Sequence, residues 1–179
     1  MDAAWVAIVA LRLLLPLAIL RWPLVGGTIA FLADTFDVVL LDRLGVTDYG
    51  PYNAVDKALD TYYLTLEAWV CLGWRRGTAR TVGLSLFVYR LVGALLYELT
   101  DERLLLLLFP NLFEAFFLTY LLVRRVAGER ALTTTPQIIA LNLLLLGPKL
   151  LQEYLLHVER FPIYSVIREF LLAPLRLVT

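Results

Sequence analysis

The chain contains one cysteine, Cys71, and one histidine, His157. A single cysteine excludes a disulfide within the chain and any metal site built from several thiolates. A single histidine likewise excludes a metal centre built from a cluster of histidines. The chemistry of this chain therefore has to rest on other residue types.

An excess of charge of either sign is also absent, because 16 Lys and Arg residues balance 16 Asp and Glu residues. A zero net charge gives no support for a nucleic-acid partner. The sequence contains no P-loop, no G-x-G-x-x-G, no H-E-x-x-H and no N-glycosylation acceptor. We therefore expect no nucleic-acid binding, and none of the functions that these motifs carry.

Apolar residues are abundant, with 60% of the chain hydrophobic and a mean hydropathy of +0.76. Ordinary soluble domains are about 45–50% apolar, so this composition predicts an integral membrane protein in contact with a lipid bilayer. A plasma or inner membrane is the expected location. Because Asp2 stands where a signal peptide carries basic residues, the first apolar stretch is expected to be retained as a span.

A helix needs about 20 mostly apolar residues to cross a bilayer, and six stretches of the chain approach this length. The predicted fold is an all-α, polytopic integral membrane bundle of about six transmembrane helices in one domain, residues 1–160. An amphipathic, interfacial C-terminal segment, residues 161–179, is expected to follow. The predicted spans are Ala4–Leu20, Leu24–Leu44, Asn53–Trp74, Ala79–Leu99, Leu104–Val126 and Pro136–His157.

Basic residues in the short connections predict the orientation of these spans. The connections after the first, third and fifth spans carry most of them, which places these connections inside and the N-terminus outside. The residues concerned are Arg21, Arg75, Arg76, Arg80, Arg124, Arg125 and Arg130.

Carboxylates outnumber bases inside the apolar stretches, where only Arg12, Arg90 and Lys149 could neutralise them. A charge at the centre of a bilayer costs about 2.5–3.5 kcal/mol, so such residues usually face a protein interior or a wet cavity. The surplus of acid over base indicates a need for protons, a metal ion or a cationic solute. The seven carboxylates are Asp34, Asp37, Asp60, Glu67, Glu98, Glu114 and Glu153.

Helical spacing gathers these polar residues into stripes. Asp56, Asp60, Tyr63 and Glu67 follow steps of four, three and four and therefore share one helix face. Similar stripes on other spans predict a shared polar interior that binds a solute or an ion. Its predicted residues are Asp34, Asp37, Asp60, Glu67, Arg90, Glu114, Lys149 and Glu153.

The stretch from Asp34 to Asp60 resembles the signature of the CDP-alcohol phosphatidyltransferases. That signature reads D-x2-D-G-x2-A-R-x8-9-G-x3-D-x3-D and runs from the second of six spans into the third. Arg12 and Pro16 also resemble a basic residue and a proline that are common in the first span of that family. The four aspartate positions are occupied here by Asp34, Asp37, Asp56 and Asp60.

This resemblance implies a metal-dependent transfer of a phosphoalcohol group. Asp34, Asp37 and Asp56 would hold divalent metal ions, Mg²⁺ or Mn²⁺, on the CDP-linked diphosphate. Asp60 would be the catalytic base that activates the acceptor alcohol.

The chain departs from the signature at its other positions. Val38 and Tyr52 stand where the signature has glycine, and Leu41-Asp42 replaces the Ala-Arg pair. Glycine allows close approach of a ligand to the backbone, which Val38 would obstruct. A diverged, non-catalytic relative of the family is therefore an open alternative.

Three functions follow from these features. The first is a membrane protein that binds or moves a cation or a cationic solute, with or without coupling to protons. The second is an accessory or structural subunit whose partner is another membrane protein or a second copy of this chain. The third is a divergent, metal-dependent CDP-alcohol phosphatidyltransferase.

Overall fold

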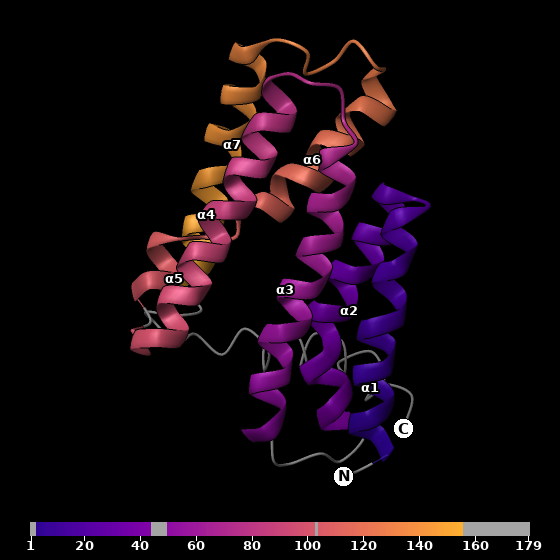
Figure 1. Cartoon of the computed structure of the whole chain (residues 1–179), viewed down its shortest axis with the longest axis vertical. Coiled ribbons are helices and arrows are strands. Elements are labelled where there is room, and N and C mark those ends of the chain that lie inside the picture. Colours follow the sequence, from indigo (N-terminus) through magenta and orange to yellow (C-terminus); the bar gives the residue numbers. More distant parts are fainter. Residues whose placement is uncertain (1–2, 44–49, 103, 156–179) are drawn as a thin grey trace, which may run out of the picture.

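A computed structural model describes residues 3–43, 50–102 and 104–155, and every regular element in this part of the chain is a helix. The prediction of an all-α protein is confirmed for these residues. The predicted C-terminal segment, 161–179, and the predicted domain boundary at residue 160 lie outside them. Figure 1 labels α1 (Ala3–Leu14), α2 (Pro23–Arg43), α3 (Gly50–Leu72), α4 (Thr78–Thr100), α5 (Leu104–Leu108), α6 (Leu112–Ala127) and α7 (Thr135–Glu153).

The first predicted span, Ala4–Leu20, is not one continuous α-helix. α1 ends at Leu14 and continues as a short 3₁₀ helix, η1 (Leu15–Leu20), which contains Pro16. Proline has no backbone N–H to donate and its ring crowds the preceding turn, so the α-helical pattern breaks there. The chain then reverses at Arg21 and Trp22, both of which donate a backbone hydrogen bond to the carbonyl of Ala18 at 3.1 and 2.8 Å.

After this reversal, α2 runs antiparallel to α1 and η1. Near the turn, Gly26 packs so tightly that a Cβ atom there would meet the backbone of Ile19. At the far end of the same pair, buried Leu41 packs with buried Ile8. The pairing of α1 with α2 is therefore fixed at both ends, and it sets which side chains face each other in between.

The fifth predicted span, Leu104–Val126, is interrupted. Phe109–Asn111 separates α5 from α6, because Pro110 cannot continue the helical hydrogen bonds. Asn111 then caps α6 by accepting a hydrogen bond from the backbone N–H of Glu114 at 3.4 Å. Two side chains of α4 donate to the carbonyls before the break: Tyr89 to Leu108, and Arg90 to Phe109 at 3.1 Å.

The sixth predicted span, Pro136–His157, corresponds to α7, which begins at Thr135. Thr134 and Gln137 form a capping box at its start, so two otherwise unpaired backbone N–H groups are satisfied. Residues from 156 onward, His157 included, lie outside the described part of the chain.

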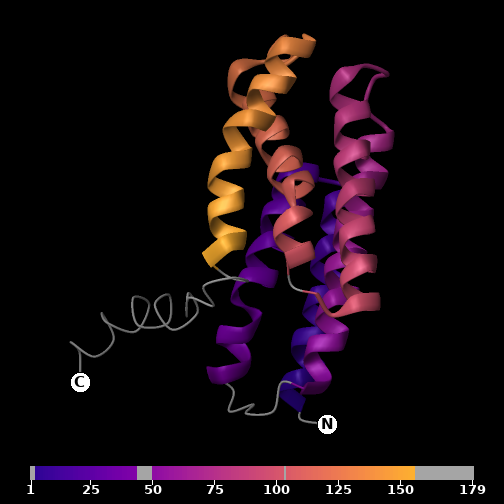
Figure 2. The same cartoon turned by 90° about the vertical axis from the view of Figure 1, so that its left-hand side faces the viewer.

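Aromatic side chains of α6 form the centre of the core. Phe113, Phe116 and Phe117 have no exposed surface. Trp74, which follows α3, stacks on Phe117 with ring centroids 5.7 Å apart and also packs against Tyr120 at 4.4 Å. These contacts join α6 to the end of α3, and the long helices lie roughly along one common axis in Figure 2.

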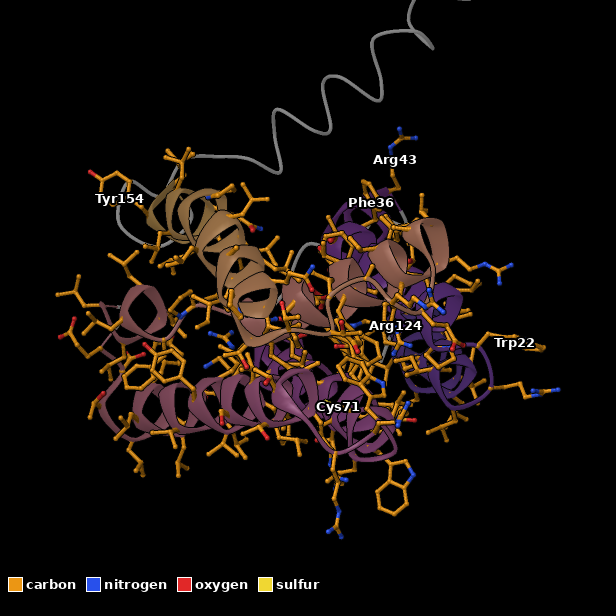
Figure 3. All side chains as sticks on the ribbon, turned by 90° about the horizontal axis from the view of Figure 1, so that it is seen from above. Trp22, Phe36, Arg43, Cys71, Arg124 and Tyr154 are labelled. Atoms are coloured by element: carbon orange, nitrogen blue, oxygen red, sulfur yellow. The ribbon has the colours of Figure 1, made fainter. Side chains whose placement is uncertain are left out.

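Two helical stretches of the described chain are long and apolar enough to cross a membrane, Thr78–Thr100 and Leu104–Ala127. Their mean hydropathies are 1.5 and 1.8, and the second stretch contains the break at Pro110. Large apolar side chains also point outward, as Trp22 does in Figure 3 with 60% of its surface exposed. These features support membrane association. They do not establish the predicted number of six spans.

Candidate functional site

Arg12 lies at the centre of a cluster of four aspartates. Its side chain is 3% exposed, and its two terminal nitrogens each donate to two carboxylates. One nitrogen, Nη1, bonds Asp37 and Asp56. The other, Nη2, bonds Asp34 and also Asp60, the latter at 2.6 Å. We call Asp34, Asp37, Asp56 and Asp60 the aspartate cluster.

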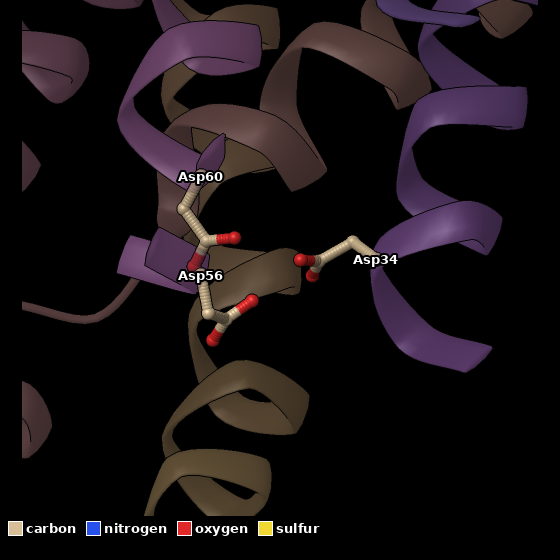
Figure 4. A group of neighbouring side chains, drawn as sticks. All are labelled: Asp34, Asp56 and Asp60. Atoms are coloured by element: carbon tan, nitrogen blue, oxygen red, sulfur yellow. The ribbon is translucent and has the colours of Figure 1, made fainter. Parts of the chain in front are cut away.

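The helix pairing described above explains why these residues meet. Because α2 runs antiparallel to α1, Asp34 and Asp37 lie beside Arg12, and their spacing of three puts both on one face of α2. Asp56 and Asp60, four apart, lie on one face of α3. Figure 4 shows the carboxylate of Asp34 reaching across from α2 towards those of Asp56 and Asp60.

The aspartate cluster is closed on one side and open on the other. The Asp37 side chain is 4% exposed, whereas those of Asp34, Asp56 and Asp60 are 28%, 35% and 33% exposed. In the described part of the chain, Arg12 is the only base that forms an ion pair with the last three. Three partly exposed carboxylates therefore share one guanidinium in the described part of the chain, and a further cation could reach their open side.

The open side of the cluster has the donors that a divalent metal ion requires. One carboxylate oxygen from each of Asp34, Asp56 and Asp60 lies within 4.8 Å of the others. Carboxylate oxygens are the ligands preferred by Mg²⁺ and Mn²⁺, which also retain water molecules, and the partial exposure leaves access for water. The residues present therefore fit a bound Mg²⁺ or Mn²⁺. The resemblance of this stretch to the transferase signature predicted such a gathering of the four aspartates.

A second polar group lies further along α3. The hydroxyl of buried Tyr63 donates to Oε1 of Glu114 on α6 at 2.7 Å, and Nδ2 of Asn111 donates to Oε2 at 3.0 Å. The Glu114 side chain is thus held by α3 and by the cap of its own helix. Its 5% exposure places it in the interior.

Glu67 differs from all other described carboxylates. It has no exposed surface, and neither of its carboxylate oxygens has a hydrogen-bond partner. Gly27 of α2 lies beside this carboxyl group, because a Cβ atom at position 27 would be only 3.1 Å from Oε1 of Glu67. The absence of a side chain at Gly27 therefore makes room for this carboxyl group.

The other predicted site residues do not join the aspartate cluster. Arg90 donates to the carbonyl of Phe109, and Lys149 donates to Oε1 of Gln152 at 3.1 Å. Both cations are near enough to Glu114 to interact with its charge. The side chain of Glu153 lies outside the described part of the chain. By their contacts, the polar side chains form the aspartate cluster, the Tyr63–Glu114–Asn111 group and Glu67.

Glu98 was also predicted to lie inside the membrane region. Its side chain is 54% exposed and pairs with Lys57 at 2.6 Å. A solvated pair of this kind needs no further cation, so Glu98 does not belong to the surplus of unpaired acids.

Sequence reasoning did not predict Arg12 as a site residue. The signal was present, since Arg12 is the only base in the first apolar stretch and lies about as far before the Arg21–Pro23 turn as Asp34 lies after it. An antiparallel pair of helices brings such positions together. No protein-family model, curated protein or solved structure matches this chain.

Proposed function

We propose that the chain is a multi-pass integral membrane protein. Support comes from its 60% hydrophobic composition and from outward-facing apolar residues such as Leu99, Val126 and Leu144, which are 74%, 79% and 72% exposed. α2 and α3 have 21 and 23 residues, a length that crosses the hydrocarbon core at about 1.5 Å per residue. Their carboxylates would then face the bundle interior rather than lipid.

The proposed topology can be tested with single cysteines in a Cys71→Ala background. Glu102→Cys and Thr133→Cys place the thiol in exposed connections on either side of α6. We expect a membrane-impermeant maleimide to label position 102 from outside intact cells and position 133 only after the membrane is opened, because the arginine-rich connection stays inside. The parent Cys71→Ala protein serves as the unlabelled control, and labelling of both positions from one side would contradict the topology.

We further propose that the aspartate cluster binds a divalent cation, Mg²⁺ or Mn²⁺. The observation that carries this proposal is that Asp34, Asp56 and Asp60 lie close together and are partly exposed, and that Arg12 is the one base that forms an ion pair with them in the described part of the chain. Like charges at such separations repel strongly unless a cation neutralises them. A cation that enters from the open side would supply the missing positive charge.

Calorimetric titration of the purified protein with Mg²⁺ and Mn²⁺ tests this proposal. We expect binding to weaken by about tenfold or more in Asp56→Asn and in Asp60→Asn, because each loses a charged ligand. Asp101→Asn is the matched control, since Asp101 is exposed and lies at the end of α4, away from the cluster. Unchanged affinity in the two cluster variants would contradict the proposal and favour a structural role, in which the acids and Arg12 only hold helices together.

A metal-dependent phosphoalcohol transferase is the second candidate. The observation that favours it is that the four aspartates at the signature positions converge on Arg12, as the resemblance to CDP-alcohol phosphatidyltransferases requires of a common site. A metal held by Asp34, Asp37 and Asp56 would supply charge neutralisation for the diphosphate. Asp60 would accept the proton of the acceptor alcohol. The oxygen of that alcohol would then bond to phosphorus as CMP leaves.

The same variants separate the two candidates. CMP release from a CDP-linked lipid that requires Mg²⁺ or Mn²⁺ and is lost in Asp60→Asn would support the transferase. Cation binding without CMP release from any such lipid would support a cation-binding protein alone.

A further inference from the structure

Within the described helices, Glu67 is fully enclosed and meets no counter-charge. It lies on α3 between α2 and α6, and none of its surface is exposed. A Cβ atom at Gly27 would lie 3.1 Å from Oε1 of Glu67, 2.8 Å from a methyl of Leu118 and 3.4 Å from the ring of Phe117. The space beside the carboxyl group is thus bordered by apolar atoms of α6 and the backbone of α2.

The ionisable groups that face this region are few. On α3, Tyr63 lies one turn before Glu67, and buried Cys71 lies one turn after it. On α6, Glu114 is close enough to repel Glu67 if both groups are ionised. α2 places Gly27, which has no side chain, beside the carboxyl group of Glu67. No basic side chain described on α2, α3 or α6 contacts this carboxyl group.

Two cations act on Glu114, the acid that neighbours Glu67, and both also donate hydrogen bonds to other groups. Arg90 of α4 bonds the carbonyl of Phe109, and Lys149 of α7 bonds Gln152. Their charges act on Glu114, which the hydrogen bonds from Tyr63 and Asn111 already hold. Glu67 therefore has neither an ion pair nor a hydrogen bond within the described part of the chain.

We propose that Glu67 is a proton-binding site and carries its proton as a neutral carboxylic acid. A carboxylate without a partner in an apolar interior is costly, and the group avoids this cost by taking up a cation. A metal ion would need several oxygen ligands or waters, which the apolar walls do not supply. A proton needs only the carboxyl group itself.

The position of Glu67 links this site to the aspartate cluster. Asp60, Tyr63 and Glu67 follow one another on the same face of α3, and the Tyr63 hydroxyl bridges to Glu114. Glu67 thus lies at the inner end of a polar stripe whose outer end, at Asp56 and Asp60, is partly exposed. Tyr63 and Asp60 therefore lie between Glu67 and the exposed end of the stripe.

Infrared spectroscopy of the full chain in lipid nanodiscs tests the inference. A protonated carboxylic acid has a carbonyl stretching band, absent from carboxylates, that shifts to lower frequency in D₂O. We expect this band at neutral pH in the parent protein, its loss in Glu67→Gln, and its retention in Glu129→Gln, which changes a residue of the exposed α6–α7 connection. Absence of the band in the parent, or its persistence in Glu67→Gln, would overturn the inference.

A stability measurement keeps the inference testable if Glu67→Gln folds poorly. Methionine has a similar size and no charge, so Glu67→Met should unfold at the same temperature as the parent or higher if Glu67 is neutral. A clear fall in the unfolding temperature of Glu67→Met would instead indicate an ionised Glu67 whose counter-ion loses its partner. That result would overturn the inference.

The test of proton binding at Glu67 does not depend on whether the aspartate cluster binds a cation. Glu67→Gln should still bind Mg²⁺ or Mn²⁺ if the aspartate cluster does, and Asp60→Asn should keep the carboxylic acid band. Loss of cation binding in every sample would count against the proposed function alone.

Discussion

Replacing Arg12 with methionine is expected to destabilise the protein by about 3–5 kcal/mol, the cost of removing one member of a buried ion-pair network. Arg12 is 3% exposed and its guanidinium is shared by all four carboxylates of the aspartate cluster. Without it, these carboxylates repel one another and α1, α2 and α3 lose their common contact. The free energy of unfolding in detergent micelles measures the loss.

Lys57→Met provides the matched control for Arg12→Met. Lys57 also forms an ion pair, with Glu98, but both side chains are about half exposed, at 46% and 54%. Exposed pairs contribute about 0–1 kcal/mol, so Lys57→Met should unfold much like the parent. Equal losses in the two variants would mean that Arg12 does not organise the cluster.

The stability lost in Arg12→Met should depend on pH and on divalent cations. Acid protonates aspartates and removes their mutual repulsion, so the difference from the parent should shrink as the pH falls. Mg²⁺ or Mn²⁺ should restore part of the lost stability, because a ligand that binds only the folded state stabilises it. Restoration by the cation would also indicate that Arg12 and the metal ion neutralise the same oxygens.

The local features of the fold were largely predictable from the sequence. Proline and glycine positions predicted the turn at Arg21–Pro23, and the steps of three and four predicted that Asp56 and Asp60 share a face of α3. Proline marks the places where two predicted spans are not continuous helices, although Leu104–Ala127 remains long and apolar enough to cross a membrane. Pro16 and Pro110 interrupt stretches that are apolar enough to look continuous when hydropathy alone is considered.

The partners of the charged residues were harder to predict, because they depend on how helices distant in sequence align. Arg90 and Lys149 were expected to neutralise acids, yet Arg90 bonds the carbonyl of Phe109 just before Pro110. A backbone carbonyl beside a proline break can accept a hydrogen bond from a guanidinium, and it becomes available only once the helix breaks. The convergence of the four aspartates, by contrast, could be predicted, because the signature relates positions on two neighbouring helices.

Glu67 illustrates a different limit of the sequence. Its spacing from Asp60 predicted a place on the same polar face, and it does lie on that face of α3. Only the packing of Gly27 and α6 around it leaves both oxygens without a partner. Whether a buried acid is paired or alone is decided by neighbouring helices, which the periodicity of a single helix does not contain.

The aromatic core beside Glu67 leads to the second large expected effect. Phe117→Ala should cost about 3–5 kcal/mol, because Phe117 has no exposed surface and its removal leaves a cavity between α6, Trp74 and α2. Phe117 and Glu67 border the same point next to Gly27, so water that enters this cavity can reach the Glu67 carboxyl group. The carboxylic acid band of Glu67 should then shift or disappear along with the loss of stability.

Leu122→Ala is the control for Phe117→Ala, because Leu122 lies on the same helix with half of its side chain exposed. Substitutions at such positions change stability by about 0.5 kcal/mol, and this one should leave the infrared band of Glu67 as it is in the parent. A Phe117→Ala protein that is destabilised but keeps the unchanged band would mean that the cavity stays dry. A protein no less stable than Leu122→Ala would mean that α6 does not pack against α2 and the end of α3, and the enclosure of Glu67 would fail with it.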